Sequence, residues 1–304
     1  RRGVGGAARG GSRGAGRRAG ARSARRKPGR SDGAAPRNAC AATGMTPTRP
    51  PRAFDGAALE GRLAALLWPG AAVGVADPAR PPAQLPEREA RAVAHAADIR
   101  RREFAAGRSA ARQALAALGR PDAVIPQGAD RAPLWPDGVV GSIAHCRDVA
   151  VAAAAPFARL AGLGVDVEPD RPLTSDLWDG LFTETERAFL DRAPAPEAAA
   201  LRVFCAKEAA YKAHYPRARQ LLEPRDVTLR ATGDDRFEAS FPDGASIAVR
   251  VGSLAGFVLA AATVPADARK RSVSGEEKAN SWQFRGKGDR NETGVKDVAR
   301  RPGA

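Results

Sequence analysis

The sequence predicts an α+β fold built from two similar halves, which a pseudo-two-fold axis would relate. Two observations carry this prediction: a long helical pattern followed by strands occurs once at residues 87–155 and again at residues 196–262. We place the junction between the halves near residue 162. Because ligands often bind where two structural units meet, we expect the active site at this junction.

In the first half, the stretch 87–118 has a helical pattern, with Phe104, Ala111, Leu115 and Leu118 at spacings of three, four and seven. Gly119 follows as a helix C-cap. Residues 139–144 and 149–155 are typical of two short strands, and the turn His145-Cys146-Arg147-Asp148 would join them into a hairpin.

The second half begins with a strand at 163–168, which Pro169 ends. Thr183 and Glu186 have the spacing of a capping box and predict a short helix that includes Phe189 and Leu190. Residues 196–214 form the clearest helical pattern of the chain. Four more strands are predicted, at 227–229, 237–241, 247–251 and 257–262.

The net charge of +15 lies in the two ends of the chain. Residues 1–44 hold 12 basic residues and one acid, and residues 269–304 hold 10 basic residues and five acids. The remaining stretch, 45–268, has 27 basic and 28 acidic residues and is close to neutral. The high charge therefore does not indicate the partner of the folded part. We expect four segments: tails at 1–44 and 269–304, and two folded halves, N-terminal at 45–161 and C-terminal at 162–268.

Residues 1–38 are mostly Arg, Gly, Ala and Ser, a composition that buries too little apolar surface to fold. Two interpretations stay open: an RGG-like RNA-binding arm, and a gene-prediction or cloning artefact, which we favour. The single methionine, Met45, stands where the composition becomes ordinary and would suit as the natural start. The tail 269–304 is interpreted as a disordered or foreign extension.

Three cysteines, Cys40, Cys146 and Cys205, are widely spaced and fit neither a disulfide framework nor a zinc site. No stretch has the length and apolarity of a membrane span, and no apolar segment follows the basic N-terminus as in a signal peptide. These observations favour a cytoplasmic location.

Two acidic segments carry the candidate chemistry. On a strand, Asp166 and Glu168 share one face while Val165 and Val167 point into a core. On a helix, Glu208 and Lys212 lie one turn apart, with Lys207 beside Glu208. Carboxylates close together repel unless a cation lies between them, and three carboxylates with two lysines suit a divalent cation that holds a phosphate or pyrophosphate.

Five motifs in order resemble the 4′-phosphopantetheinyl transferases, most closely the surfactin and enterobactin synthase branch. They span about residues 54–262 and are Arg101-Arg102-Glu103-Phe104 with Gly107-Arg108 and Arg112, Arg131-Ala132-Pro133-Leu134-Trp135-Pro136, Gly141-Ser142-Ile143-Ala144-His145-Cys146, Gly164-Val165-Asp166-Val167-Glu168, and Phe204-Cys205-Ala206-Lys207-Glu208 through Lys212. Each motif is short, and their order is what makes the resemblance specific.

The resemblance implies an enzyme that moves the 4′-phosphopantetheine arm of coenzyme A onto a serine of an apo acyl, aryl or peptidyl carrier protein and releases 3′,5′-ADP. Such carriers serve siderophore, nonribosomal peptide or polyketide assembly. It implies Mg²⁺ on Asp166, Glu168 and Glu208, with Glu208 also the general base and Lys212 a catalytic cation. It also implies coenzyme A contacts from a further set: Arg108, Arg112, Arg131, His145, Lys207 and Lys212.

One position departs from the family. Many relatives have a serine where this chain has Ala144, so one hydrogen bond to coenzyme A, worth about 0.5–1.5 kcal/mol, would be absent. Ser142 points the same way on the strand but is not expected to replace it. We expect a monomer in which the two halves close one site.

Each motif alone has a plainer interpretation. A single Asp-x-Glu is most often a solvated strand face, and Glu208 with Lys212 an exposed ion pair worth about 0.3–0.5 kcal/mol. Two other classes of function compete: a different Mg²⁺-dependent phosphoryl-transfer or nucleotide-processing enzyme, and a nucleic-acid-binding protein that uses the basic tails. The first lacks support because the chain has no P-loop motif, and for the second we consider nucleic acid an improbable partner.

Overall fold

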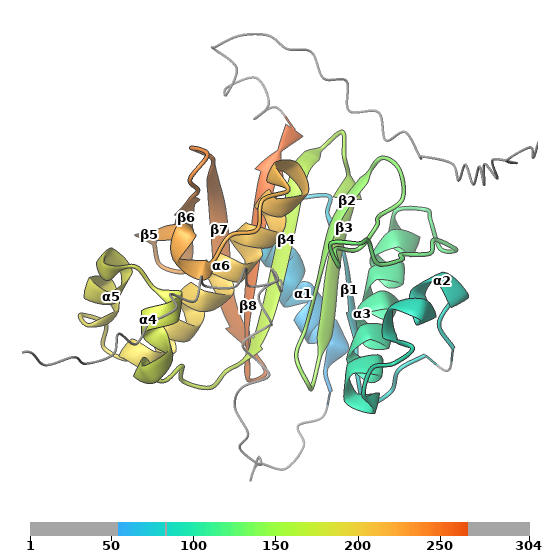
Figure 1. The fold of residues 1–304 in the computed structure, drawn as a ribbon, viewed down its shortest axis with the longest axis horizontal. Helices are drawn as coiled ribbons and strands as arrows, with labels where there is room; N and C mark the ends of the chain where they lie inside the picture. The colour runs from blue at the N-terminus through green and yellow to red at the C-terminus, as the bar shows by residue number, and fades with distance from the viewer. Residues whose placement is uncertain (1–53, 83, 267–304) are drawn as a thin grey trace, which may run out of the picture. The chain divides into compact units, whose positions relative to one another are not determined.

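The computed structural model describes residues 54–82 and 84–266, so both basic tails lie outside the described residues. Within this part, helices and antiparallel strands alternate in an α+β architecture, as the sequence predicts (Figure 1). The first elements in chain order are α1 (Gly56–Leu66), β1 (Ala72–Ala76), α2 (Glu87–Ala90), η2 (Arg91–Val93), α3 (Asp98–Ala117), β2 (Val139–His145), β3 (Ala150–Pro156) and β4 (Leu160–Pro169). They are followed by η3 (Ser175–Leu177), α4 (Trp178–Leu181), α5 (Glu184–Leu190), α6 (Pro196–Ala218), η4 (Pro224–Asp226), β5 (Thr228–Gly233), β6 (Arg236–Ser240), β7 (Ser246–Leu254) and β8 (Phe257–Pro265).

The strands form two antiparallel sheets. The first has three strands in the order β1-β3-β2, and the second has five in the order β4-β8-β7-β6-β5. Strand β2 is therefore an edge of the first sheet and β4 an edge of the second. These two edges carry His145 and Asp166, respectively.

Each sheet is covered by one long helix, and in both cases a glycine of a strand lets the helix approach closely. A Cβ atom at Gly74 of β1 would lie 2.1 Å from the carbonyl oxygen of Ala110 in α3. A Cβ atom at Gly164 of β4 would lie 1.9 Å from the carbonyl oxygen of Ala209 in α6. Alanines on the facing sides of both helices are fully buried, so small residues on strand and helix together set this short separation.

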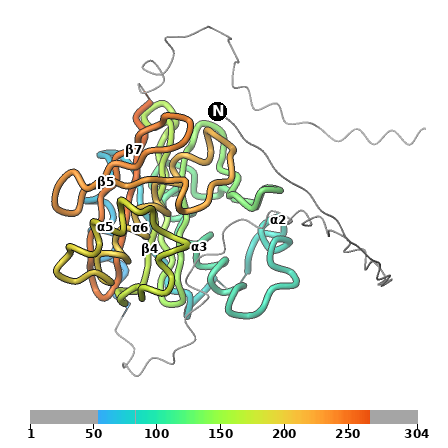
Figure 2. Tube along the Cα trace, turned by 60° about the vertical axis from the view of Figure 1, so that its left-hand side comes forward, coloured from blue at the N-terminus to red at the C-terminus, as the bar shows by residue number. Residues whose placement is uncertain are grey.

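Helix α1 covers the other side of the junction. Its Leu59 and Leu63 belong to one buried cluster with Val165 and Val167 of β4, and strands of both sheets contribute to the cluster. Figures 1 and 2 show α1, in blue, behind the strands when α6 is in front. The predicted inward orientation of Val165 and Val167 is confirmed, because both are almost completely buried.

The two sheets meet along β2 and β4. The Ser142 hydroxyl of β2 accepts a hydrogen bond from the Val165 backbone N–H of β4 at 3.0 Å. Ser142 thus joins the strand of His145 to the strand of Asp166. Its hydroxyl already has this partner, which agrees with the expectation that it does not replace the serine missing at Ala144.

Most predicted elements are present, with shifted ends. The hairpin β2–β3, the strand β4 and the Thr183 capping box are confirmed, as are the four C-terminal strands. Helix α6 continues to Ala218, four residues beyond the predicted end, and includes Pro216. The sequence analysis did not predict α1 or β1, and it treated 87–118 as one helical stretch where the structure has α2, η2 and α3.

Candidate active site

The acidic face of β4 is buried against α6. Asp166 and Glu168 point to the same side of the strand and are both less than one-tenth exposed. The Asp166 carboxylate is divided in its contacts: Oδ1 accepts a hydrogen bond from the Lys212 ammonium at 2.6 Å, whereas the buried Oδ2 has no recorded partner among the described residues. A buried carboxylate oxygen without a partner is costly, so this atom is a candidate ligand for a cation.

On α6, Glu208 and Lys212 stand one turn apart, as the sequence predicts, and they face Asp166. The pKa of Glu208 is raised to about 7: burial raises it most, the Lys212 charge opposes this effect, and the Asp166 charge adds to it. Burial opposes the charge of Lys212, yet Asp166 and Glu208 together raise the pKa of its ammonium. The site therefore holds a carboxyl group whose pKa is close to neutral pH, beside a charged lysine.

The three carboxylates predicted to bind a metal are not gathered into one ligand cluster. Within residues 54–82 and 84–266, no group of three or more His, Cys, Asp or Glu side chains is placed to hold an ion. The reason lies in Lys212, whose ammonium takes the position of a cation on Asp166. The donor set still fits Mg²⁺, because Asp166 Oδ2 is buried and unpartnered and the neighbouring Glu208 and Glu168 offer only oxygen.

Lys207 does not lie with this group. Its side chain is buried, and its ammonium is within hydrogen-bond distance of three oxygens: the Leu181 carbonyl at 2.9 Å, the Pro224 carbonyl at 2.8 Å and the Glu186 carboxylate at 2.7 Å. Three oxygens use all three N–H donors of a lysine. The structure thus differs from the prediction that Lys207 contacts phosphate, and its contacts are those of a structural cation. The residue next to Glu208 in sequence points about 100° away from it around the helix.

His145, at the end of β2, faces the other side of the junction. Its Nε2 accepts a hydrogen bond from Arg100 of α3 at 2.7 Å, so the ring proton of the neutral histidine is on Nδ1, which lies 3.7 Å from the Glu103 carboxylate. Burial lowers the pKa of His145 to about 3, and the charges of Arg100, Lys212 and Arg108 add to this effect. Three cations therefore act on one neutral histidine.

Of the three predicted arginines, the structure places only Arg108 beside His145. Arg108 is 5% exposed; its Nε donates to the Ile125 carbonyl at 2.6 Å, and the guanidinium lies over the Phe104 ring. Burial lowers its pKa to about 10. No carboxylate pairs with it, and among the described residues no hydrogen bond is recorded for its two terminal nitrogens. A buried cation without an anionic partner is the signature of an anion site.

The other two arginines lie elsewhere. Arg112 pairs with the buried Glu89 at 2.7 Å. Arg131 is exposed on a turn with a φ of 66°, and no contact joins its side chain to the site. Sequence reasoning also missed one member of the site, Arg100. Its signal was helical spacing, because Arg100, Phe104 and Arg108 follow one another at intervals of four residues.

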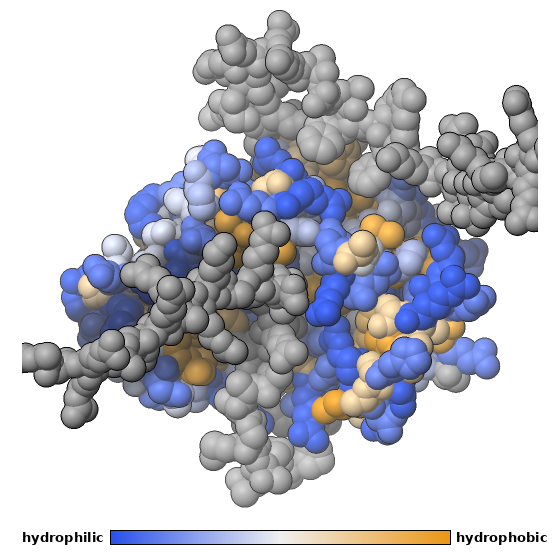
Figure 3. All heavy atoms as spheres, viewed as in Figure 1, coloured by the Kyte–Doolittle hydropathy of each residue, from blue (hydrophilic) through white to orange (hydrophobic). Residues whose placement is uncertain are grey.

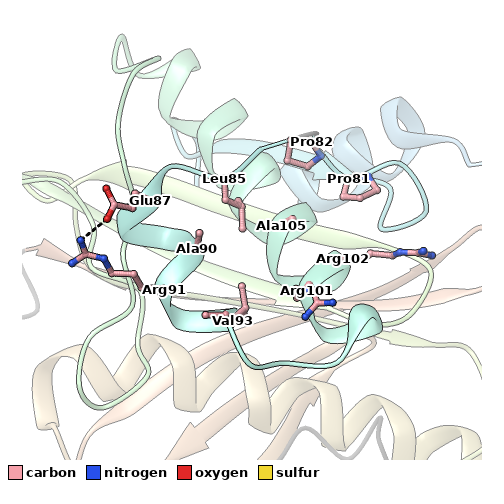
Figure 4. A pocket seen from close by; sticks show the side chains of 11 residues that line it. Pro81, Pro82, Leu85, Glu87, Ala90, Arg91, Val93, Arg101, Arg102 and Ala105 are labelled. Atoms are coloured by element: carbon pink, nitrogen blue, oxygen red, sulfur yellow. Dashed lines mark hydrogen bonds and ion pairs between the residues drawn. The ribbon is translucent and has the colours of Figure 1, made fainter.

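A groove of about 490 Å³ lies away from these residues. Apolar side chains of the 81–94 segment and Ala105 line it, with Arg91, Arg101 and Arg102 at its border (Figure 4). On this side of the molecule, Figure 3 shows apolar residues surrounded by hydrophilic ones. Neither Asp166, Glu208, Lys212 nor His145 lines the groove, so the candidate site is the junction of the sheets. No helix in the described part of the chain combines the length and apolarity needed to cross a membrane.

Comparison with known proteins finds one family for two segments of the chain. The model of the 4′-phosphopantetheinyl transferase N-terminal domain matches residues 88–155, and that of the 4′-phosphopantetheinyl transferase superfamily matches residues 162–263. Together the two matches cover more than half of the chain.

Three curated relatives illustrate the similarity. The chain is 40% identical over 124 residues to 4′-phosphopantetheinyl transferase Npt of Nocardia iowensis, which is 41% of this chain and 56% of the relative. It is 38% identical over 146 residues to 4′-phosphopantetheinyl transferase PptT of Mycobacterium tuberculosis (strain ATCC 25618 / H37Rv), covering 48% and 64%. It is 38% identical over 117 residues to enterobactin synthase component D of Salmonella typhi, covering 38% and 48%. The chain thus spans about half to two-thirds of the length of these relatives.

Proposed function

Because the chain belongs to the 4′-phosphopantetheinyl transferase superfamily, we propose that it transfers the 4′-phosphopantetheine arm of coenzyme A to a serine of an apo carrier protein. The observation that carries this proposal is the buried Arg108, which has no carboxylate partner and lies beside His145 and Arg100. On the other side of the same junction lie Asp166, Glu208 and Lys212. A group of cationic side chains next to buried carboxylates suits a substrate that carries several phosphates.

Coenzyme A has a pyrophosphate and a 3′-phosphate, and the site offers cations for both. Arg100 and Arg108 extend from α3, and Lys212 extends from α6, so the substrate would bridge the two halves. Arginine can bind a phosphate with two parallel hydrogen bonds, whereas lysine acts as a point charge. His145 can donate a hydrogen bond to a phosphate oxygen from a protonated ring nitrogen. The negative charge of a bound polyanion would favour the protonated form of this nitrogen.

Asp166 and Glu208, with Glu168 as a third candidate, would hold the Mg²⁺ ion that the resemblance implies. When bound, the ion supplies positive charge that offsets the charge of the pyrophosphate oxygens. The support for this part is the unpartnered Asp166 Oδ2 and the oxygen-only donor set.

In the proposed reaction, the serine hydroxyl oxygen of the carrier attacks the β-phosphorus of coenzyme A, and the bond between this phosphorus and the bridging oxygen of 3′,5′-ADP breaks. The carboxylate of Glu208 accepts the serine proton, directly or through a water molecule. Lys212 stabilises the negative charge that develops on the leaving phosphate.

The carrier we propose is an acyl, aryl or peptidyl carrier protein of siderophore, nonribosomal peptide or polyketide assembly. The name of the Salmonella relative, enterobactin synthase component D, supports the siderophore class. We propose a monomer as the active unit, with both sheets of one chain contributing to the site.

The test uses the full-length protein with coenzyme A, Mg²⁺ and a panel of apo carrier proteins. We expect the mass of at least one carrier to rise by one phosphopantetheine arm, and we expect EDTA to abolish the change. A carrier in which the acceptor serine is replaced by alanine is the control. An unchanged mass for every aryl, peptidyl and acyl carrier would contradict the proposed activity.

A further inference from the structure

Glu89 of α2 is a buried carboxylate that lies outside the candidate site. It is 0% exposed, and it accepts hydrogen bonds from Arg112 at 2.7 and 3.0 Å and from the Ile125 backbone N–H at 2.8 Å. No motif in the sequence singled it out. A fully buried acid requires this degree of pairing, so the three hydrogen bonds from Arg112 and Ile125 hold both partners closely.

The Ile125 peptide connects Glu89 to the anion site. Its N–H donates to Glu89, and its carbonyl accepts from Arg108 Nε at 2.6 Å. Ile125 itself is fully buried and lies 17 residues beyond Arg108, in the segment after α3. The backbone N–H and carbonyl of this one residue therefore link Glu89 to Arg108.

Glu89 also determines which arginine stays available. Arg112 lies one helical turn after Arg108 and takes both oxygens of the Glu89 carboxylate. Arg108 is close enough for the Glu89 charge to act on it, yet it makes no ion pair with any residue of 54–82 and 84–266. Because Arg112 occupies the acid, the terminal nitrogens of Arg108 stay free for a ligand.

We propose that Glu89 is a positioning residue for coenzyme A binding: through Arg112 and the Ile125 peptide, it holds the Arg108 guanidinium toward the phosphates of the substrate. This inference rests on the proposed function. Glu89 does not touch the substrate, and it acts only by fixing where Arg108 points. Without the charge of Glu89, Arg112 would lack its ion-pair partner, and the hydrogen bond that ties the segment at Ile125 to α2 would be weaker.

The test is a double-mutant cycle of Glu89→Gln and Arg108→Met in the full-length protein. Glutamine keeps the volume and an acceptor for the Ile125 N–H but removes the charge that holds Arg112. We expect Glu89→Gln to raise the dissociation constant of coenzyme A and its KM by about tenfold, the size of one weakened charge-assisted hydrogen bond, with kcat within about twofold of wild type. Because Glu89 acts through Arg108, the double variant should bind no more weakly than Arg108→Met alone.

Two comparisons separate positioning from a general loss of structure. Glu87→Gln on the same helix, where Glu87 pairs with Arg91 at the surface, is the matched control and should bind coenzyme A as wild type does. Additive effects in the double variant, or an unchanged dissociation constant for Glu89→Gln, would overturn the inference. A fall of kcat and coenzyme A affinity together with the melting temperature would also overturn it.

A second measurement needs no substrate. The Arg108 Nε–H should give an NMR signal protected from hydrogen exchange in the wild-type protein, and the protection should be lost in Glu89→Gln but kept in Glu87→Gln. Unchanged protection in Glu89→Gln would refute the positioning role. If wild-type protein fails to bind coenzyme A, the proposed function is what fails, and the NMR comparison still decides the role of Glu89.

Discussion

Two lysines five residues apart on α6 have different surroundings. Lys207 is enclosed by three oxygens that fasten α4, α5 and the segment at Pro224 to α6. Lys212 is about one-fifth exposed, and its ammonium pairs with the Asp166 carboxylate. The same side-chain chemistry therefore supports the fold at one position and is available to a substrate at the other.

Replacing each lysine by methionine separates these roles. Lys207→Met leaves the buried Glu186 without its cation, so we expect a loss of about 3–5 kcal/mol in the free energy of unfolding. Adding Glu186→Gln to Lys207→Met should restore part of the lost free energy of unfolding, as measured by urea denaturation. Lys212→Met should lower kcat/KM for coenzyme A by about 100-fold with a smaller loss of stability. Equal stability losses for the two variants, with normal turnover for Lys212→Met, would contradict this division.

The low pKa of His145 predicts sensitivity to acid. The folded protein holds this histidine neutral down to a pKa of about 3, whereas an unfolded chain binds the proton near pH 6.5. The unfolded state therefore binds more protons between these values, and the stability present above pH 6.5 falls as the pH is lowered. At pH 4.5 we expect His145→Gln to recover about 2 kcal/mol relative to wild type in chemical denaturation, compared with pH 7. His95→Gln, at an exposed position, is the control, and equal pH profiles of wild type and His145→Gln would refute the prediction.

At the scale of elements, the distance between α6 and β4 decides whether Glu208 and Asp166 meet. Gly164 permits this approach, because a side chain there would run into the Ala209 carbonyl. Gly164→Ala should therefore push the helix from the strand, cost about 1–3 kcal/mol of stability and lower kcat as well. Gly61→Ala on α1 is the matched control: nothing lies within 4 Å of its Cβ, and helix propensity should make it stabilising by about 0.5–1 kcal/mol. Both are measured by thermal denaturation and turnover, and a neutral Gly164→Ala would contradict the contact.

The elements that could be predicted from the sequence are those with a local signal. Alternating apolar residues indicated β4, and the Thr183 and Glu186 spacing indicated the capping box of α5. Strand β1, with only five residues, and α1, which starts at the Asp55 cap, were not predicted. Both pack on long-range partners, Ala110 and Val165 among them, that a local pattern does not show.

Local sequence patterns likewise predicted only part of the candidate site. Asp166, Glu208 and Lys212 meet as the strand and helix periodicities predict. Lys207 and Arg112 were assigned to the site by the resemblance of their motifs to the family, but their buried partners, Glu186 and Glu89, are 21 and 23 residues away. Which cation is neutralised inside the fold depends on tertiary contacts, and a motif does not contain them.

At the scale of the whole molecule, we assign the proposed transferase activity to the near-neutral part of the chain. We propose transferase halves at 45–161 and 162–268 and assign no catalytic role to the segments 1–44 and 269–304. A protein trimmed to 45–268 should keep its kcat/KM for coenzyme A within about twofold. If the basic tails instead bind RNA, the full-length protein should show an affinity that falls steeply with salt and disappears on trimming, as electrophoretic mobility shifts would measure. Loss of transfer on trimming would contradict the proposed boundaries.

The central claim is that the phosphopantetheine arm is transferred at the buried carboxylates of the sheet junction. These carboxylates lie next to Lys212, and Arg108 lies on the other side of the junction. Asp166→Asn keeps the size of the side chain and removes the charge that faces Lys212 and Glu208. The most direct measurement is the rate at which full-length Asp166→Asn converts an apo carrier to its phosphopantetheinylated form at saturating coenzyme A and Mg²⁺, followed by intact-protein mass. We predict a rate at least about 100-fold below wild type with the fold retained, while the exposed Asp137→Asn reacts normally. Wild-type turnover in Asp166→Asn would contradict the claim.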